Sequence, residues 1–261
     1  RQRDARRIAR YAAGQAMPDT TFSPLTARDG TNLVVMDWPL DKGPVRGVVL
    51  IVHGLGEHAW RYDTLAQRLN AWGFAVRAYD QYGHGESMGP RGALPRSDRL
   101  LSDLAELVDE SRARMHGDTP LIVLGHSMGG LVAARFVCLG LRRLEGLVLS
   151  SPALDPGLST FQKLLVAILP ALVPDLRVRN GLDPEFISHD PQVVARYRAD
   201  PLVHDRISAR LAQFIARNGP ATVACAATWK LQTLLLYAGS DKLVNPAGSR
   251  AFASAAPPGI V

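Results

Sequence analysis

A serine set between glycines is the most reactive pattern in the chain. Ser127 is the centre of a Gly-His-Ser-Met-Gly motif that follows the apolar run 121–124 and precedes a helix-like stretch at 131–141. A strand that turns into a helix through one serine holds that serine on a sharp corner, so its hydroxyl projects beyond the sheet. The glycines remove Cβ atoms that would collide in so tight a turn. The pattern therefore predicts a nucleophilic serine on a nucleophile elbow.

A serine nucleophile also needs donors that stabilise the negative charge on the attacked carbonyl oxygen. The backbone N–H of Met128, directly after the nucleophile, is predicted to be one such oxyanion donor. The second is the N–H of Leu55, in the His-Gly-Leu-Gly loop that follows the apolar strand predicted over 45–52. A plain strand-to-helix turn is the alternative interpretation of this glycine-rich loop.

The general base and the acid that orients it complete such a site. Asp241, in a Gly-Ser-Asp turn after the strand predicted over 231–237, is predicted to be the acid. Its rival is Asp155, and an Asx turn without a catalytic role is the alternative explanation of Asp241. The chain order in this type of site is Ser, Asp, His, but no histidine follows Asp241.

The histidines that are present all precede Asp241, and simpler structural roles account for each of them, such as bracing the loops at the sheet edge. We therefore expect the natural protein to continue past Val261 and to carry the base there. A chain ending at Val261 would be a poor hydrolase or a binding protein. The histidines considered are His53, His58, His84, His116, His126, His189 and His204.

Strands alternate with helices over most of the chain, which predicts a mostly parallel sheet with helices on both faces. Asp29-Gly30 between two β-rich runs predicts an antiparallel hairpin at the start. The alternation stops at 154–228, which is expected to be an all-helical inserted cap. The expected organisation is a basic arm at 1–16, a core at 17–153 and 229–261 that lacks its last strand and helix, and this cap.

Composition is that of an ordinary globular protein, with 47% hydrophobic residues and a net charge of +6. Five arginines and one aspartate among the first ten residues supply most of that charge. No nucleic-acid motif accompanies them, so we expect a solvated arm or an attraction to an anionic membrane surface. With no secretory leader visible and no apolar run long enough to span a bilayer, a cytoplasmic protein is expected. Cys138 and Cys225 are interpreted as buried thiols of a reducing compartment.

Four motifs of the chain are His53–His58, Gly83–Ser87, Gly125–Gly130 and Ala238–Val244. Together they resemble the monoacylglycerol lipase/lysophospholipase branch of the α/β-hydrolases. This resemblance implies an α/β-hydrolase fold, Ser127 as nucleophile, Asp241 as acid, and Leu55 and Met128 as oxyanion donors, with no cofactor and no metal. Two cap segments, 190–194 and 197–204, also resemble that branch. Tyr82 departs from it, because many α/β-hydrolases have arginine there.

The predicted substrate is a small lipid ester of the monoacylglycerol kind. The apolar segment 161–173 is either a helix buried between cap and core or a lid that lines an acyl tunnel or touches lipid. A thioesterase, an amidase or peptidase, an acyltransferase and a non-catalytic binding protein are the alternatives. A metal site that uses His53, Glu57 and His58 is not predicted, because these residues sit on a glycine-bearing turn instead of at i, i+4 on a helix, and no further ligand is evident. Acyl length, head group and oligomeric state are left open.

Overall fold

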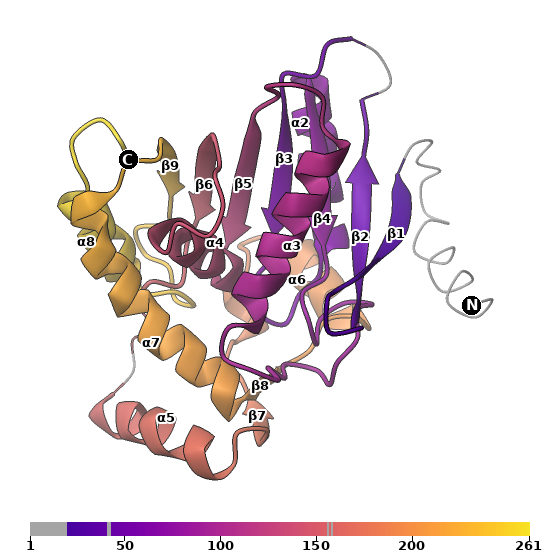
Figure 1. Ribbon diagram of the computed structural model, residues 1–261. Helices are drawn as coiled ribbons and strands as arrows, with labels where there is room; N and C mark the ends of the chain where they lie inside the picture. The colour runs from indigo at the N-terminus through magenta and orange to yellow at the C-terminus, as the bar shows by residue number, and fades with distance from the viewer. Residues whose placement is uncertain (1–19, 41–42, 156, 158) are drawn as a thin grey trace.

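A central sheet of seven strands runs through the part of the chain that this computed structural model describes, residues 20–261 without 41, 42, 156 and 158 (Figure 1). Its strand order is β1-β2-β4-β3-β5-β6-β9, with antiparallel pairing from β1 through β2 to β4 and parallel pairing beyond. The predicted hairpin and the parallel sheet are therefore confirmed, while the predicted arm at 1–16 lies outside the described residues. The strands are β1 (Thr21–Thr26), β2 (Asn32–Trp38), β3 (Gly47–Val52), β4 (Phe74–Tyr79), β5 (Leu121–His126), β6 (Gly146–Ser150) and β9 (Thr233–Leu236).

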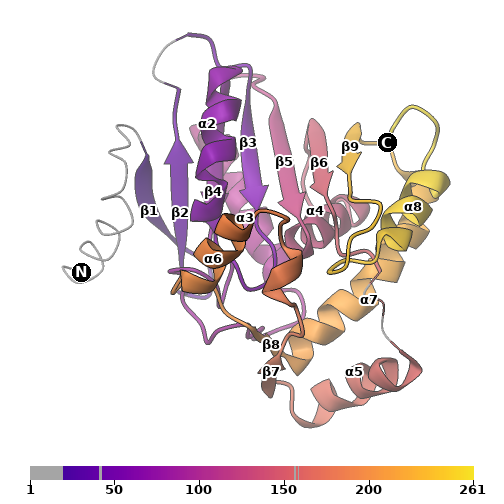
Figure 2. The same ribbon diagram turned by 180° about the vertical axis from the view of Figure 1, so that it is seen from behind.

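Strand β3 shows why the sheet is covered on both faces. Leu50 and Val52 belong to one apolar cluster and Val49 and Ile51 to another, because successive side chains of a strand point to opposite faces. Helices α3, α4, α7 and α8 contribute to the first cluster, and α2 contributes to the second. Figures 1 and 2 show these two layers from opposite sides. The helices are α2 (Asp63–Ala71), α3 (Arg99–Arg114), α4 (Met128–Cys138), α5 (Thr160–Leu172), α6 (Pro191–Ala199), α7 (Ala209–Cys225) and α8 (Pro246–Ala255), with 3₁₀ turns η1 (Ala59–Tyr62), η2 (Pro184–Phe186) and η3 (Ala226–Thr228).

The segment between β6 and β9 corrects the expectation of an all-helical cap. Two short strands, β7 (Arg177–Arg179) and β8 (Arg206–Ser208), pair antiparallel to each other and stand apart from the main sheet. Three-residue strands with exposed arginines carry almost no hydrophobic periodicity, so the sequence pattern contains no signal for them. Their pairing brings together the two ends of the stretch 180–205, which contains η2 and α6 (Figure 1).

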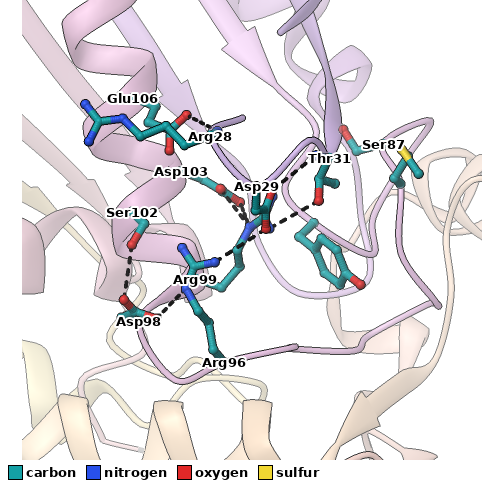
Figure 3. Close-up of polar contacts among 12 residues, drawn as sticks. Arg28, Asp29, Thr31, Ser87, Arg96, Asp98, Arg99, Ser102, Asp103 and Glu106 are labelled. Carbon is teal, nitrogen blue, oxygen red and sulfur yellow. Dashed lines mark hydrogen bonds and ion pairs between the residues drawn. The ribbon is translucent and has the colours of Figure 1, made fainter. Parts of the chain in front are cut away.

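The hairpin between β1 and β2 is fastened to α3 by charged groups (Figure 3). Arg99 is 1% exposed, donates to Asp103 over 2.7–2.8 Å and pairs with Asp29 of the hairpin. Its guanidinium lies 4.9 Å from the ring centroid of Tyr82. The tyrosine that departs from the family pattern is thus the platform on which this buried arginine stacks.

A disulfide between Cys138 and Cys225 joins the C-terminal ends of α4 and α7, with Cα atoms 6.1 Å apart. The interpretation of these residues as separate buried thiols is therefore wrong. The two cysteines are 87 positions apart in sequence, and sequence spacing alone does not show which helix ends meet in space.

Candidate active site

Ser127 occupies a strained backbone conformation between β5 and α4. Its φ is 51° and its ψ is −118°, a combination that costs a non-glycine residue on the order of 1–3 kcal/mol. Three backbone hydrogen bonds hold it there. The N–H of Ser127 donates to Ser150 O over 2.9 Å, and its carbonyl accepts from the N–H groups of Leu131 and Ala153, each over 3.0 Å. The predicted elbow is present, with its serine at the carboxyl end of the sheet.

Glycines let the elbow approach the end of β3. A Cβ on Gly129 would overlap the carbonyl oxygens of Val52 and His53, and one on Gly54 would lie 3.2 Å from Ser127 Cβ. The glycines of the elbow are therefore required by close backbone contact as well as by the turn itself. This contact brings the loop after β3 beside the serine.

The two predicted oxyanion donors lie on these touching segments. Helix α4 begins at Met128, so the N–H of that residue is among those at the helix start that have no intrahelical acceptor. Leu55 lies in the loop between Gly54 and Gly56. The N–H of Gly54 donates to Glu57 Oε1 over 2.6 Å, and the carbonyl of Gly56 accepts from the N–H of His204 over 2.9 Å.

Glu57 belongs to the same corner, a feature that the sequence reasoning missed. Its carboxylate accepts from Gly54 N–H, from the Tyr62 hydroxyl over 2.7 Å and from Arg61 Nε over 3.0 Å. Burial opposes its ionisation, but nearby groups, His126 foremost, outweigh burial and hold the pKa of Glu57 below its usual value. An ionised carboxylate therefore lies against Gly54, the residue whose added Cβ would be 3.2 Å from Ser127 Cβ. The Glu-x-x-x-Arg-Tyr spacing after the glycine-rich loop was the available signal.

The acid candidates lie on the loops after β6 and β9. Asp241 Oδ1 accepts from the N–H groups of Leu243 and Val244 over 2.9 and 3.0 Å, which is the Asx-type turn of the alternative interpretation. Asp155 Oδ2 accepts from Asn245 Nδ2 over 2.6 Å. The two loops therefore meet, and each carboxylate is oriented by hydrogen bonds.

The histidines near the elbow have other partners. His53 is fully buried; its Nδ1–H donates to Gly54 O over 2.7 Å and its Nε2 accepts from Gln81 N–H over 3.0 Å. His84 Nδ1–H donates to Tyr82 O over 3.0 Å. His126 Nδ1 lies 3.0 Å from Ser150 Oγ. Within the described residues no hydrogen bond joins a histidine to Ser127, and His53 and His84 brace loops as expected.

No set of three histidine, cysteine, aspartate or glutamate side chains in the described chain is arranged to hold a metal ion. His58, weighed as a ligand, instead donates from Nε2 to Asp200 Oδ2 over 2.7 Å. Across the same residues, every helix is too short or too polar to cross a bilayer.

The strand order and the strained serine between β5 and α4 define an α/β-hydrolase. The family model described as "Serine aminopeptidase, S33" matches residues 43–259, so the chain belongs to this family of serine hydrolases and is an enzyme of that class. The chain is 38% identical over 224 residues to the monoacylglycerol lipase of Mycolicibacterium smegmatis, covering 85% of this chain and 79% of that protein. It is 31% identical over 212 residues to the phospholipase YtpA of Bacillus subtilis, covering 80% of each.

Among solved structures, the monoacylglycerol lipase of Paleococcus ferrophilus superposes with a TM-score of 0.79 at 35% identity. The match covers 87% of this chain and 86% of that one. The likeness to monoacylglycerol lipases and the predicted fold are therefore confirmed.

Proposed function

We propose that this enzyme hydrolyses monoacylglycerol-like lipid esters through an acyl-enzyme on Ser127. The Ser127 hydroxyl attacks the ester carbonyl, the N–H groups of Leu55 and Met128 stabilise the oxyanion, and the alcohol leaves. Water then releases the fatty acid. A histidine base, a role that the site assigns to none of the seven histidines of this sequence, takes the serine proton and passes it to the leaving alcohol. Asp241 is the acid that orients that base. The strained Ser127 against the Gly54 loop is the observation that carries the proposal, and the similarity to lipases supports it.

A polar corner beside the serine supports an ester of a hydroxyl-rich alcohol. Glu57 and Arg61 form an ion pair over 3.0 Å, and the Arg61 guanidinium lies 4.7 Å from the ring centroid of Tyr197. A carboxylate and a guanidinium accept from and donate to alcohol hydroxyls, respectively. We propose that this corner binds the glycerol part of the substrate while the acyl chain lies elsewhere.

Helix α5 supports an apolar acyl chain or a lipid surface as the other part of the target. Its side chains Leu164, Ile168 and Leu172 are 56%, 48% and 72% exposed. The interpretation of this segment as a helix buried between cap and core therefore does not apply to these residues. An exposed row of large aliphatic side chains is typical of surfaces that bind lipid. We propose that α5 makes peripheral contact with the lipid aggregate that holds the substrate.

The test combines active-site labelling with a substrate panel. A fluorophosphonate probe is expected to add once, on the peptide containing Ser127, and Ser127→Ala is expected to lose both the adduct and all measurable hydrolysis. Monooleoylglycerol is expected to be cleaved at least ten times faster, in kcat/KM, than the matching amide or lysophosphatidylcholine. Failure of both labelling and hydrolysis would overturn the proposed acyl-enzyme mechanism on Ser127.

A lysophospholipase is the second candidate, favoured by the 31% identity to the phospholipase of Bacillus subtilis. Faster cleavage of lysophosphatidylcholine than of monooleoylglycerol in the same panel would replace the first proposal with this one.

A further inference from the structure

The cap touches the His53–His58 loop at two points that frame the proposed oxyanion donor. The N–H of His204 donates to the carbonyl of Gly56 over 2.9 Å. Asp200 Oδ2 accepts from His58 Nε2 over 2.7 Å, with side chains 11% and 1% exposed. Both partners on the cap side belong to the segment 200–204, whose resemblance to the lipase family the proposed mechanism leaves unexplained.

A row of three imidazole rings, each tilted against the next, makes a third connection between cap and loop. The His204 ring centroid lies 4.7 Å from that of His84, which lies 5.3 Å from that of His53. His53 in turn donates to Gly54 O over 2.7 Å. His53 and His84 are fully buried, so their positions are fixed by packing on every side.

The cap and the His53–His58 loop are in close backbone contact at Gly56. Gly56 has φ +76°, and a Cβ at this position would overlap the His204 carbonyl oxygen. The backbone of the cap therefore lies directly against the residue that follows Leu55. On the other side of Leu55, Gly54 is held by Glu57 over 2.6 Å.

We propose that Asp200 and His204 are positioning residues for the oxyanion hole, acting through the His53–His58 loop to orient the N–H of Leu55. The inference rests on the proposed function, because it concerns an oxyanion donor. The cap holds Gly56 and His58, and the core holds Gly54. The peptide plane of Leu55, which lies between these residues, therefore has little freedom to rotate. A donor prepositioned in this way stabilises developing charge without reorganisation during the reaction.

The test separates positioning from substrate binding. Asp200→Ala and His204→Ala are each expected to lower kcat about 10- to 100-fold with KM within about threefold, which is less than the loss of a whole oxyanion donor. The affinity for a trifluoromethyl ketone, whose adduct oxygen occupies the oxyanion hole, should fall in step with kcat/KM. Asp200→Asn retains an acceptor and His204→Phe retains a ring, so each should recover most of the activity.

Asp205→Ala is the matched control, because Asp205 is the next residue along and its side chain is 50% exposed. It is expected to leave kcat and inhibitor affinity unchanged. An unchanged kcat in Asp200→Ala and His204→Ala, or a rise in KM alone, would overturn the inference. So would a lack of recovery in both conservative variants.

Hydrogen exchange of the peptide covering 54–57 distinguishes this inference from the proposed function. Faster exchange in both alanine variants, but not in Asp205→Ala, supports the positioning of the loop by Asp200 and His204, even if the unaltered enzyme cleaves no ester. Unchanged exchange in alanine variants of an active enzyme would overturn the inference that Asp200 and His204 position the loop, while the proposed function would stay intact.

Discussion

The two halves of the segment between β6 and β9 are built in opposite ways. The half around α5 exposes large aliphatic side chains and packs along α7, with Gln213 Nε2 donating to Val166 O over 3.2 Å (Figure 2). In the other half, called the tied half, residues 200–210 are bound to the core by backbone and side-chain hydrogen bonds. Ser208 N–H donates to Gly92 O over 2.8 Å, and Arg210 Nη1 donates to Pro95 O over 2.8 Å.

One inserted segment can therefore serve two physical purposes. Exposed apolar area has a favourable free energy of transfer to a lipid phase, so the α5 half suits contact with substrate aggregates. A half fixed by directional hydrogen bonds suits the positioning of catalytic groups. The contrast predicts that variants in one half change interfacial catalysis and variants in the other change the chemical step.

The largest expected effect comes from the close backbone contact between Gly56 and His204 of the tied half. Gly56→Ala forces a methyl group into the His204 carbonyl, so kcat/KM on a soluble short-chain ester should fall about 100-fold or more. Gly181→Ala is the matched control, because Gly181 has nearly the same φ, +77°, and in the described structure its Cβ would meet nothing within 4 Å. Equal losses in the two variants would mean that backbone strain, rather than the cap contact, explains the effect.

An intermediate effect is expected from the exposed half. The triple variant Leu164→Ser, Ile168→Ser, Leu172→Ser should lose about tenfold in activity on monooleoylglycerol presented in vesicles, because it removes apolar area that would contact lipid. Activity on a soluble short-chain ester should stay the same.

Leu139→Ser is the control for this prediction, since Leu139 is 46% exposed but lies at the end of α4. A parallel loss on soluble and vesicle substrates would break the comparison between the two halves.

The smallest expected effect is a pH dependence of the free energy of unfolding, which arises from His204 in the tied half. Burial, with repulsion from Arg91 and His53, lowers the pKa of His204 to about 4. The unfolded chain, with a histidine pKa near 6.5, therefore binds more protons between pH 6.5 and 4. Stability that His204 contributes above pH 6.5 is lost as the pH falls through this window. The loss is about 1–2 kcal/mol after allowance for partial exposure.

Chemical denaturation at pH 7.5, 6 and 4.5 measures this loss as a decrease in the free energy of unfolding. His204→Phe, which cannot be protonated, should show a shallower decrease over the same range. An equally steep decrease in that variant would assign the pH dependence to other groups.

The sheet and the elbow could be predicted from sequence because both rest on local signals. The apolar run before Ser127 and the glycines around it determine a strand, a strained turn and a helix in about twenty residues. The limits of β1, β2 and β4 likewise follow from short alternating runs. Position along the chain and the parallel-sheet rule then place Leu55, Ser127 and Asp241 on loops at one edge.

The missed features depend on pairs that are distant in sequence. The contact of His204 with Gly56, the pairing of β7 with β8 and the Cys138–Cys225 bond each join segments that local periodicity cannot connect. Tyr82 has the same explanation, because its role is visible only when Arg99 of another element lies over its ring. Glu57 was seen in its motif, but its role follows from partners that fold around it.

The disulfide between α4 and α7 also determines how the molecule behaves when its chain is cut. Both halves of the inserted segment lie between Cys138 and Cys225, so the bond closes this stretch into a covalent ring at its base. A protease that cuts one exposed bond in α5 would open the ring without dividing the molecule. The nicked protein would migrate as one species on a non-reducing gel and as two fragments after reduction. Accidental cleavage of the α5 half would therefore leave the two pieces of the enzyme covalently connected.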